Sequence, residues 1–205
     1  MLSAIDLSCI RRDTLLCEGL NFHVGPGQML QIEGPNGSGK TSLLRTLAGL
    51  TPAPVGRVEW NRREIRASAE AFRVSLLWLG HDNAVAPELS AEENLTMLSR
   101  LGGEAPGRLD VRRALEEVGL GEACGRAVRT LSQGQRRRVS LARLWCTRKP
   151  LWLLDEPLAA LDRAATTALS DRIEVHLRSG GMIVGATHHP LSKASSTATL
   201  LLQPN

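Results

Sequence analysis

A glycine-rich segment constrains the fold of this 205-residue chain more than any other feature. Residues 34–41 read Gly-Pro-Asn-Gly-Ser-Gly-Lys-Thr. An alternating segment, 29–33, precedes them and predicts a strand, and 41–50 follow with leucines on one face of a predicted helix. Glycines let the backbone turn tightly and direct successive N–H groups at phosphate oxygens, and the start of a helix adds its positive end. The pattern therefore predicts a phosphate-binding loop (P-loop) in an α/β fold, rather than a plain turn.

The loop predicts a nucleotide-binding site in which different side chains bind different parts of the ligand. Lys40 is expected to reach the β- and γ-phosphates of ATP, and the Thr41 hydroxyl is expected to hold Mg²⁺. The predicted nucleotide-binding residues are Gly34, Pro35, Asn36, Gly37, Ser38, Gly39, Lys40, Thr41 and Ser42.

A second strand with an acidic end is predicted far downstream. Residues 151–154 are an apolar run, as in a central parallel strand, and they lead into Asp155 and Glu156. Asp155 is placed to hold Mg²⁺ through water. Glu156 is placed to polarise the attacking water, a form of general-base help worth roughly 10²–10⁴-fold in rate. Two acids in a surface turn would be the ordinary alternative, but the P-loop upstream favours the catalytic interpretation.

The remaining pattern predicts one α/β domain over 1–205, with a mostly helical segment at about 83–148. Strands are expected at 74–79 and 182–186, helices at 108–118 and after Ser132 to about 145, and a loop at 102–107. Hydrophobic residues make up 42% of the chain and the net charge is +4, which suits a globular protein with a real core. The four cysteines lack metal-ligand spacing and are expected to be free thiols. No apolar run approaches the ~20 residues that cross a bilayer, so the chain is not expected to conduct anything through a membrane by itself.

One further motif carries a family resemblance. Ser132 is a good N-cap for the following helix, which makes its start a second site suited to phosphate. The segment resembles the LSGGQ signature of the ATP-binding cassette (ABC) family, with Gln133 in place of the first glycine. It comprises Leu131, Ser132, Gln133, Gly134 and Gln135. The resemblance implies that this segment contacts the γ-phosphate on the P-loop of a second copy, so that two copies enclose two ATP molecules head to tail.

The resemblance covers essentially the whole chain and implies further roles. Asp162 resembles the D-loop aspartate, and His188 resembles the switch histidine that senses the γ-phosphate. The implied catalytic residues are Glu156, His188 and Lys40, with ATP and Mg²⁺ as cofactors. The implied fold is a P-loop NTPase of the ABC type, with a mostly parallel central sheet, an N-terminal antiparallel β portion and a helical subdomain.

Two positions depart from the family pattern. Asp82 stands where cassettes usually carry glutamine, and it is a further candidate for contact with Mg²⁺. The chain has no tyrosine, and Arg11 or Arg12 stands where an aromatic residue usually stacks on adenine. The run 136–138 is three arginines, which are expected to serve the exposed face and local ion pairs of the signature helix rather than nucleic acid.

Four segments carry a narrower resemblance, to the cassettes of bacterial cytochrome c maturation, also called haem exporter ATPases. They are 77–81, 88–95, 137–145 and 187–191. This resemblance implies integral membrane partners of the CcmB and CcmC kind, haem delivery to a periplasmic chaperone or release of that chaperone, and a peripheral position on the cytoplasmic face of the inner membrane. Direct haem binding and nucleic-acid binding are not expected. The alternatives are the ATPase of another ABC exporter and a soluble ABC ATPase that acts on nucleic acid.

Overall fold

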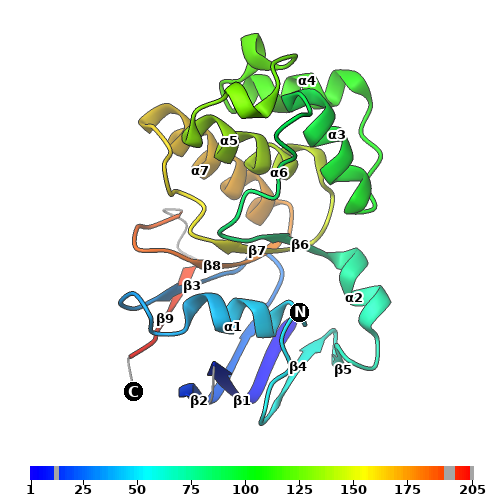
Figure 1. Cartoon of the computed structure of the whole chain (residues 1–205). Helices are drawn as coiled ribbons and strands as arrows, with labels where there is room; N and C mark the ends of the chain where they lie inside the picture. The colour runs from blue at the N-terminus through cyan, green and yellow to red at the C-terminus, as the bar shows by residue number, and fades with distance from the viewer. Residues whose placement is uncertain (12–13, 192–196, 204–205) are drawn as a thin grey trace. The chain divides into compact units, whose positions relative to one another are not determined.

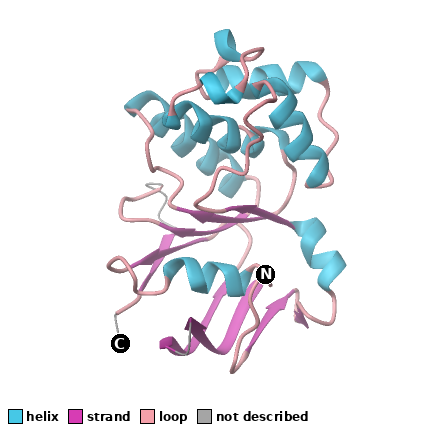
Figure 2. Cartoon of the chain, viewed as in Figure 1, coloured by secondary structure: helices cyan, strands magenta, loops and turns pink. Residues whose placement is uncertain are grey.

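The computed structural model describes residues 1–11, 14–191 and 197–203. Two compact units emerge from the contacts within the chain. The first, here called the sheet unit, comprises Met1–Gly80, Lys149–Pro157 and Val175–Asn205. The second, the helical unit, comprises His81–Arg148 and Leu158–Glu174. In Figure 2 the described strands all belong to the sheet unit, whereas the helical unit is built from helices and loops.

A five-stranded parallel sheet forms the centre of the sheet unit, in the order β6-β7-β8-β3-β9 (Figure 1). The strands β7 and β8 are buried along their whole length, which explains their uninterrupted apolar sequences. The strand bounds are Met29–Glu33 for β3, Leu76–Leu79 for β6, Leu151–Asp155 for β7, Met182–Ala186 for β8 and Thr197–Leu201 for β9.

An antiparallel sheet of order β2-β1-β4-β5 forms the second layer of this unit. The helix α1, Lys40–Leu47, contacts β1 as well as β7 and β8, so it lies between the two sheets (Figure 1). Its leucines at 43, 44 and 47 are fully buried. The strand bounds are Leu2–Arg11 for β1, Thr14–Val24 for β2, Arg57–Trp60 for β4 and Arg63–Glu64 for β5.

The helical unit has its own hydrophobic core, which includes Leu95, Leu115 and Val139. Its helices are α3 (Ala91–Leu101), α4 (Arg108–Glu117), α5 (Gln133–Leu141), α6 (Arg143–Cys146) and the larger part of α7 (Arg163–Arg178), with short 3₁₀ turns at Gly121–Ala123 and Val128–Thr130. Within the described residues, no helix has the length and apolar character that a membrane span requires.

The predicted fold class is confirmed, and the boundaries of three predicted elements are wrong. The strand predicted over 74–79 begins only at residue 76, because residues 74 and 75 are the last residues of the helix α2 (Ala69–Ser75). The Lys149 ammonium donates to the carbonyls of Arg73 and Val74 at 2.9 Å each and so satisfies the end of this helix. The helix predicted over 41–50 stops at Leu47, since Gly49 turns the chain at φ 70°. The helix after Ser132 is interrupted at Ala142 and resumes as α6.

Candidate nucleotide site

The P-loop connects β3 to α1, as the sequence predicts. Lys40 is buried, with 8% of its surface exposed, and its Nζ donates to the carbonyl oxygens of Gly34 at 2.7 Å and Pro35 at 3.3 Å. The Ser38 hydroxyl is also buried and has no hydrogen-bond partner among the described residues. A buried hydroxyl of this kind normally finds a partner, and a phosphate oxygen in the cradle is one that fits.

Thr41 and Asp155 meet at the end of β7. The Thr41 hydroxyl donates to both carboxylate oxygens of Asp155, at 3.1 Å to Oδ1 and 2.9 Å to Oδ2. Asp155 is 1% exposed, and 114 residues separate it from Thr41 in the chain. Adjacent hydroxyl and carboxylate oxygens are the ligands that a hard cation such as Mg²⁺ prefers, so the residues present fit this ion.

Glu156 adopts a strained backbone conformation. Its φ is 45°, in the left-handed region that a residue with a Cβ enters at a cost of about 1–3 kcal/mol. Its N–H donates to the carbonyl of Ala186 at 2.8 Å, so the neighbouring strand β8 holds this conformation in place. Such strain accumulates at functional sites, which agrees with the role predicted for this carboxylate.

His188 brings the predicted residues together. Its Nε2 lies 3.1 Å from Asn36 Oδ1, 3.3 Å from Lys40 Nζ and 3.5 Å from Glu156 Oε1. The ammonium of Lys40 can only donate, whereas the two oxygens require a donor, so one protonation state of the ring cannot satisfy all three. The imidazole is therefore placed to change its hydrogen-bond partner between the P-loop residues Asn36 and Lys40 and the carboxylate of Glu156.

The signature residues lie in the helical unit, at the start of α5. Ser132 is the N-cap: its hydroxyl accepts from the N–H of Gln135 at 3.2 Å, and the Gln135 side chain accepts from the N–H of Ser132 at 2.9 Å. A Cβ on Gly134 would lie 2.7 Å from the carbonyl oxygen of Ala160, which is too close. Gln133 is exposed. This contrast explains why glutamine is accepted at 133 while glycine is required at 134.

Asp162 serves the helical unit directly as the cap of α7. Its Oδ1 accepts from the N–H of Ala165 at 2.8 Å, and its Oδ2 lies 3.6 Å from Arg138 Nη1. The prediction that the three arginines serve an exposed face is wrong: Arg137 is buried and the other two are half-buried. Their guanidinium groups bind backbone carbonyls, with Arg136 on residues 128, 129 and 131 and Arg138 on 118, while the contact of Arg138 with Asp162 is an ion pair of the predicted kind.

The segment between β6 and α3 is held by Arg137 and by Asn94, a residue to which the sequence assigned no role. Arg137 Nη1 donates to the carbonyl of His81 and to Asn83 Oδ1, each at 3.3 Å. Asn94 is fully buried, and its amide binds the backbone of residues 86, 89 and 90. Asp82 itself is exposed. Arg11 is exposed at the end of β1, and Arg12 lies outside the described residues.

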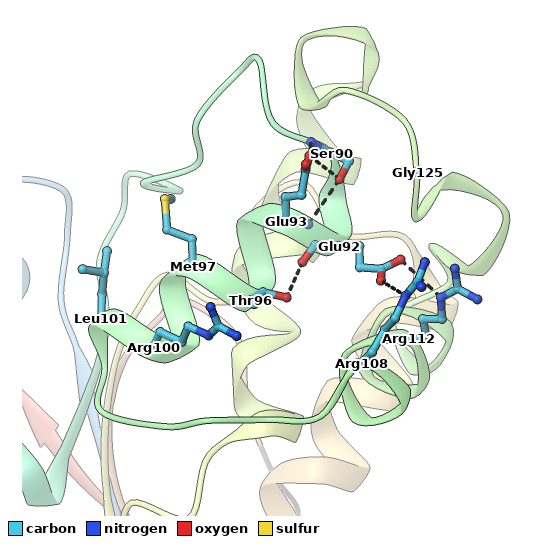
Figure 3. A pocket seen from close by; sticks show the side chains of 10 residues that line it. All are labelled: Ser90, Glu92, Glu93, Thr96, Met97, Arg100, Leu101, Arg108, Arg112 and Gly125. Atoms are coloured by element: carbon cyan, nitrogen blue, oxygen red, sulfur yellow. Dashed lines mark hydrogen bonds and ion pairs between the residues drawn. The ribbon is translucent and has the colours of Figure 1, made fainter.

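A groove of about 830 Å³ runs along α3 and α4 in the helical unit (Figure 3). Glu92 accepts from Arg108 at 2.7 Å and from Arg112 at 3.2 Å, and the hydrogen bond from Arg108 above all lowers the pKa of this carboxyl. Met97, Arg100 and Leu101 line the other end, and Leu101 is 79% exposed. The groove thus combines apolar surface with a surplus of arginines.

This arrangement defines a P-loop nucleotide-binding protein: the P-loop lies between a strand and a helix, and the acidic residues at the end of a neighbouring strand lie beside it. The ABC transporter family profile matches residues 17–159. The chain is 44% identical to the cytochrome c biogenesis ATP-binding export protein CcmA of Dechloromonas aromatica, over 96% of this chain and 97% of that protein. It is 45% identical to the protein of the same name from Nitrosospira multiformis, over 95% of each.

Solved structures agree with this assignment. An ABC transporter ATP-binding protein from Pyrococcus furiosus superposes with a TM-score of 0.84 at 26% identity, over 97% of this chain and 96% of that one. A dimeric ATP-binding cassette bound to ADP and phosphate superposes with a TM-score of 0.80 at 21% identity, over 92% of this chain and 88% of that one, and shows the shared fold. The chain belongs to the ABC transporter family, in the group of cytochrome c biogenesis ATP-binding export proteins, and is an ABC-type ATPase.

Proposed function

We propose that this chain is the ATP-hydrolysing subunit of a membrane complex for cytochrome c biogenesis. ATP hydrolysis would drive haem export or delivery, or the release of a haem chaperone. The identity of 44–45% with two proteins named for this process, over nearly the full length of each, is the observation that carries the proposal. The ATPase subunit of another ABC exporter is the second candidate, since the nucleotide site would be the same.

In the proposed site, Thr41 Oγ1 and, through water, Asp155 would hold Mg²⁺. The ion would neutralise charge on the β- and γ-phosphates. The short distances from Thr41 to both oxygens of Asp155 support this assignment.

The other side chains of the sheet unit would position the phosphates and the water. Lys40 would turn from the carbonyls of its own loop toward the β- and γ-phosphates. Glu156 would accept a proton from the water that attacks in line, and its strained backbone supports a fixed orientation for that carboxylate. His188 would exchange its contacts with Asn36 and Lys40 for the γ-phosphate, because it already lies within 3.5 Å of three of these side chains.

Two copies of the chain would assemble head to tail, with the signature of each copy on the nucleotide of the other. The capping box at Ser132 supports this role, since it fixes the start of α5 with the remaining N–H groups of its first turn available to a phosphate. The site would then be complete only in the dimer. Asp162, next to the signature in the helical unit, would stabilise the segment that precedes α7.

An integral membrane subunit of the CcmB or CcmC kind would dock on the helical unit, and the groove along α3 is the surface that suits it. Its arginines would attract acidic residues, and its exposed Leu101 would contact apolar ones. Arg137 connects the signature helix α5 to residues 81 and 83, and Asn94 on α3 binds the backbone of residue 86, three residues further along the same segment. These contacts give movement of α5 a direct route to the groove. The chain would act peripherally at the inner membrane and would not itself bind haem or nucleic acid.

The decisive experiment is co-purification from host membranes. Tagged Glu156→Gln protein with ATP and Mg²⁺ is expected to retain nucleotide, to hydrolyse it at least 10²-fold more slowly (an order-of-magnitude estimate) and to bring down multi-span proteins of cytochrome c biogenesis. Glu18→Gln, an exposed carboxylate on β2, is the matched control and should hydrolyse ATP normally. Recovery of a different permease would refute the biogenesis role and leave the ATPase in place.

A second variant tests the docking surface. Arg100→Glu reverses one exposed charge in the groove and should reduce co-purification of the membrane subunit, while the ATPase rate of the isolated protein stays unchanged. Undiminished co-purification would show that the partner docks elsewhere.

A further inference from the structure

Two of the four cysteines lie side by side in the sheet unit. Cys9 on β1 and Cys17 on β2 are paired in the antiparallel register, which is irregular on either side of Cys9. Both are free thiols and both are buried, with 1% and 6% of their surface exposed. Opposed residues of an antiparallel pair have Cα atoms about 4.5–5.5 Å apart. Disulfides span about 4.4–6.8 Å between Cα atoms, so residues paired in this way lie within the range that a disulfide bridges.

The pair is chemically asymmetric. The hydrogen bond from Cys17 holds the pKa of the Cys9 thiol below its ordinary value. The same bond, and burial after it, raise the pKa of Cys17. Burial raises the pKa of Cys124, and it raises that of Cys146 to about 11. Because the thiolate is the form that reacts, Cys9 is the more reactive thiol of the pair.

Cys9 is also connected to the P-loop helix. Its Sγ donates to the hydroxyl of Thr46 at 3.7 Å, and Thr46 donates to the carbonyl of Ser42 at 3.0 Å, one turn earlier in α1. Thr46 is buried, with 4% of its surface exposed. A disulfide removes the S–H proton of Cys9, so Thr46 would lose that donor in a place where water cannot replace it.

We propose that Cys9 and Cys17 form an oxidisable dithiol that lowers the affinity for ATP when it becomes a cross-strand disulfide. The oxidant is hydrogen peroxide. Cys9 loses its proton and its thiolate attacks one peroxide oxygen, which breaks the O–O bond and gives a sulfenic acid; the leaving hydroxide takes up the proton as the first water. The Cys17 sulfur then attacks the sulfenic acid sulfur, and the S–O bond breaks to release the second water as the S–S bond forms. The two thiols lose two electrons and the peroxide gains them. Access is through β2, which is an edge strand and opens more easily than the strands inside the sheet.

The effect on ATP rests on the proposed function, whereas the formation of the disulfide does not. The test uses the full chain and its Cys124→Ala/Cys146→Ala variant, each reduced and then treated with hydrogen peroxide. Peptide mapping should find Cys9 joined to Cys17 in both proteins, with loss of two hydrogen atoms in mass and reversal by dithiothreitol. The dissociation constant for ATP should rise on oxidation by up to about 10-fold, the most that loss of one buried hydrogen bond would produce.

Cys17→Ala is the matched control, because it keeps the contact of Cys9 with Thr46 and removes the partner thiol. It should form no disulfide, and its affinity for ATP should not change on treatment with hydrogen peroxide. Absence of the Cys9–Cys17 link in the peroxide-treated chain overturns the proposed site. A complete link with unchanged ATP affinity overturns the coupling to α1. If the reduced protein binds no ATP, the proposed function and the proposed effect of the disulfide on ATP affinity are both refuted. The peptide map then still shows whether Cys9 and Cys17 form a disulfide.

Discussion

Two glycines of the P-loop provide a test in which the structure predicts different outcomes for the same substitution. Gly37 and Gly39 both have positive φ, 88° and 98° respectively. A Cβ on Gly37 would meet no atom within 4 Å, whereas a Cβ on Gly39 would lie 2.9 Å from the Cβ of Leu16 on β2. Gly37→Ala therefore isolates the backbone cost, and Gly39→Ala adds a steric conflict to it.

The magnitudes follow from these two terms. Placing alanine in the left-handed region costs about 1–2 kcal/mol, so Gly37→Ala should lower the free energy of unfolding by that amount. Carbon atoms in contact prefer about 3.5–4.0 Å. Forcing an extra methyl into a space of 2.9 Å adds about 1–3 kcal/mol, so the total loss for Gly39→Ala is about 2–5 kcal/mol.

Urea unfolding of the nucleotide-free protein measures both losses. In a double-mutant cycle, Leu16→Gly removes the Cβ that Gly39→Ala would meet, so it should restore about 1–2 kcal/mol to the Gly39→Ala variant and nothing to the Gly37→Ala variant. Equal losses for the two glycines, or no restoration by Leu16→Gly, would refute the argument that β2 packs on the P-loop through Leu16.

Three further predictions concern single contacts. Lys149→Met removes the ammonium that binds the end of α2 and should lower the free energy of unfolding by about 1.5–3 kcal/mol in urea, whereas the exposed Arg148→Met should change it by less than about 0.5 kcal/mol. The hydrogen bond from Arg108 holds the pKa of Glu92 below its ordinary value, so its contribution to stability is fully present above the ordinary pKa and is lost as the pH falls through the folded-state pKa. Glu92→Gln should therefore reduce the difference in unfolding free energy between pH 7 and pH 3 by about 0.5–1 kcal/mol, and an unchanged difference would contradict the ion pairs. Gly134→Ala should lower the thermal unfolding temperature through its contact with the Ala160 carbonyl, while Gln133→Ala should leave it within the error of the scan.

The features that the sequence predicted correctly are those that depend on neighbouring residues in the chain. The P-loop occupies eight consecutive residues, and the fully buried strands β7 and β8 are recognisable from their apolar runs, to within one residue at each end. The helix α7 was missed, although Leu169, Ile173 and Leu177 are buried on it at intervals of four, a spacing that marks one helical face. By contrast, the end of α2 depends on Lys149, which is about 75 residues away, and no local pattern contains that contact.

In the site, too, the features that the sequence did not predict depend on contacts between residues that are distant in the chain. Charge alone suggested that the three arginines at 136–138 face solvent, but their carbonyl partners lie as far away as His81, so their burial is a property of the fold. The left-handed backbone of Glu156 is likewise invisible in the sequence, because it depends on the hydrogen bond to Ala186 in the next strand.

The strand order explains why one histidine can contact residues from both other parts of the site. The P-loop follows β3, the acidic pair ends β7 and His188 follows β8, and parallel strands bring their carboxyl ends to one edge of the sheet. Because β8 lies between β7 and β3, the residues after it lie beside both neighbours, which agrees with the distances of 3.5 Å to Glu156 and 3.3 Å to Lys40. The register pairs Asp155 with Ala186, and a slip of one residue would turn Asp155 and Glu156 to the opposite faces. The site therefore depends on the pairing of β7 with β8 as much as on the residues that carry its chemistry.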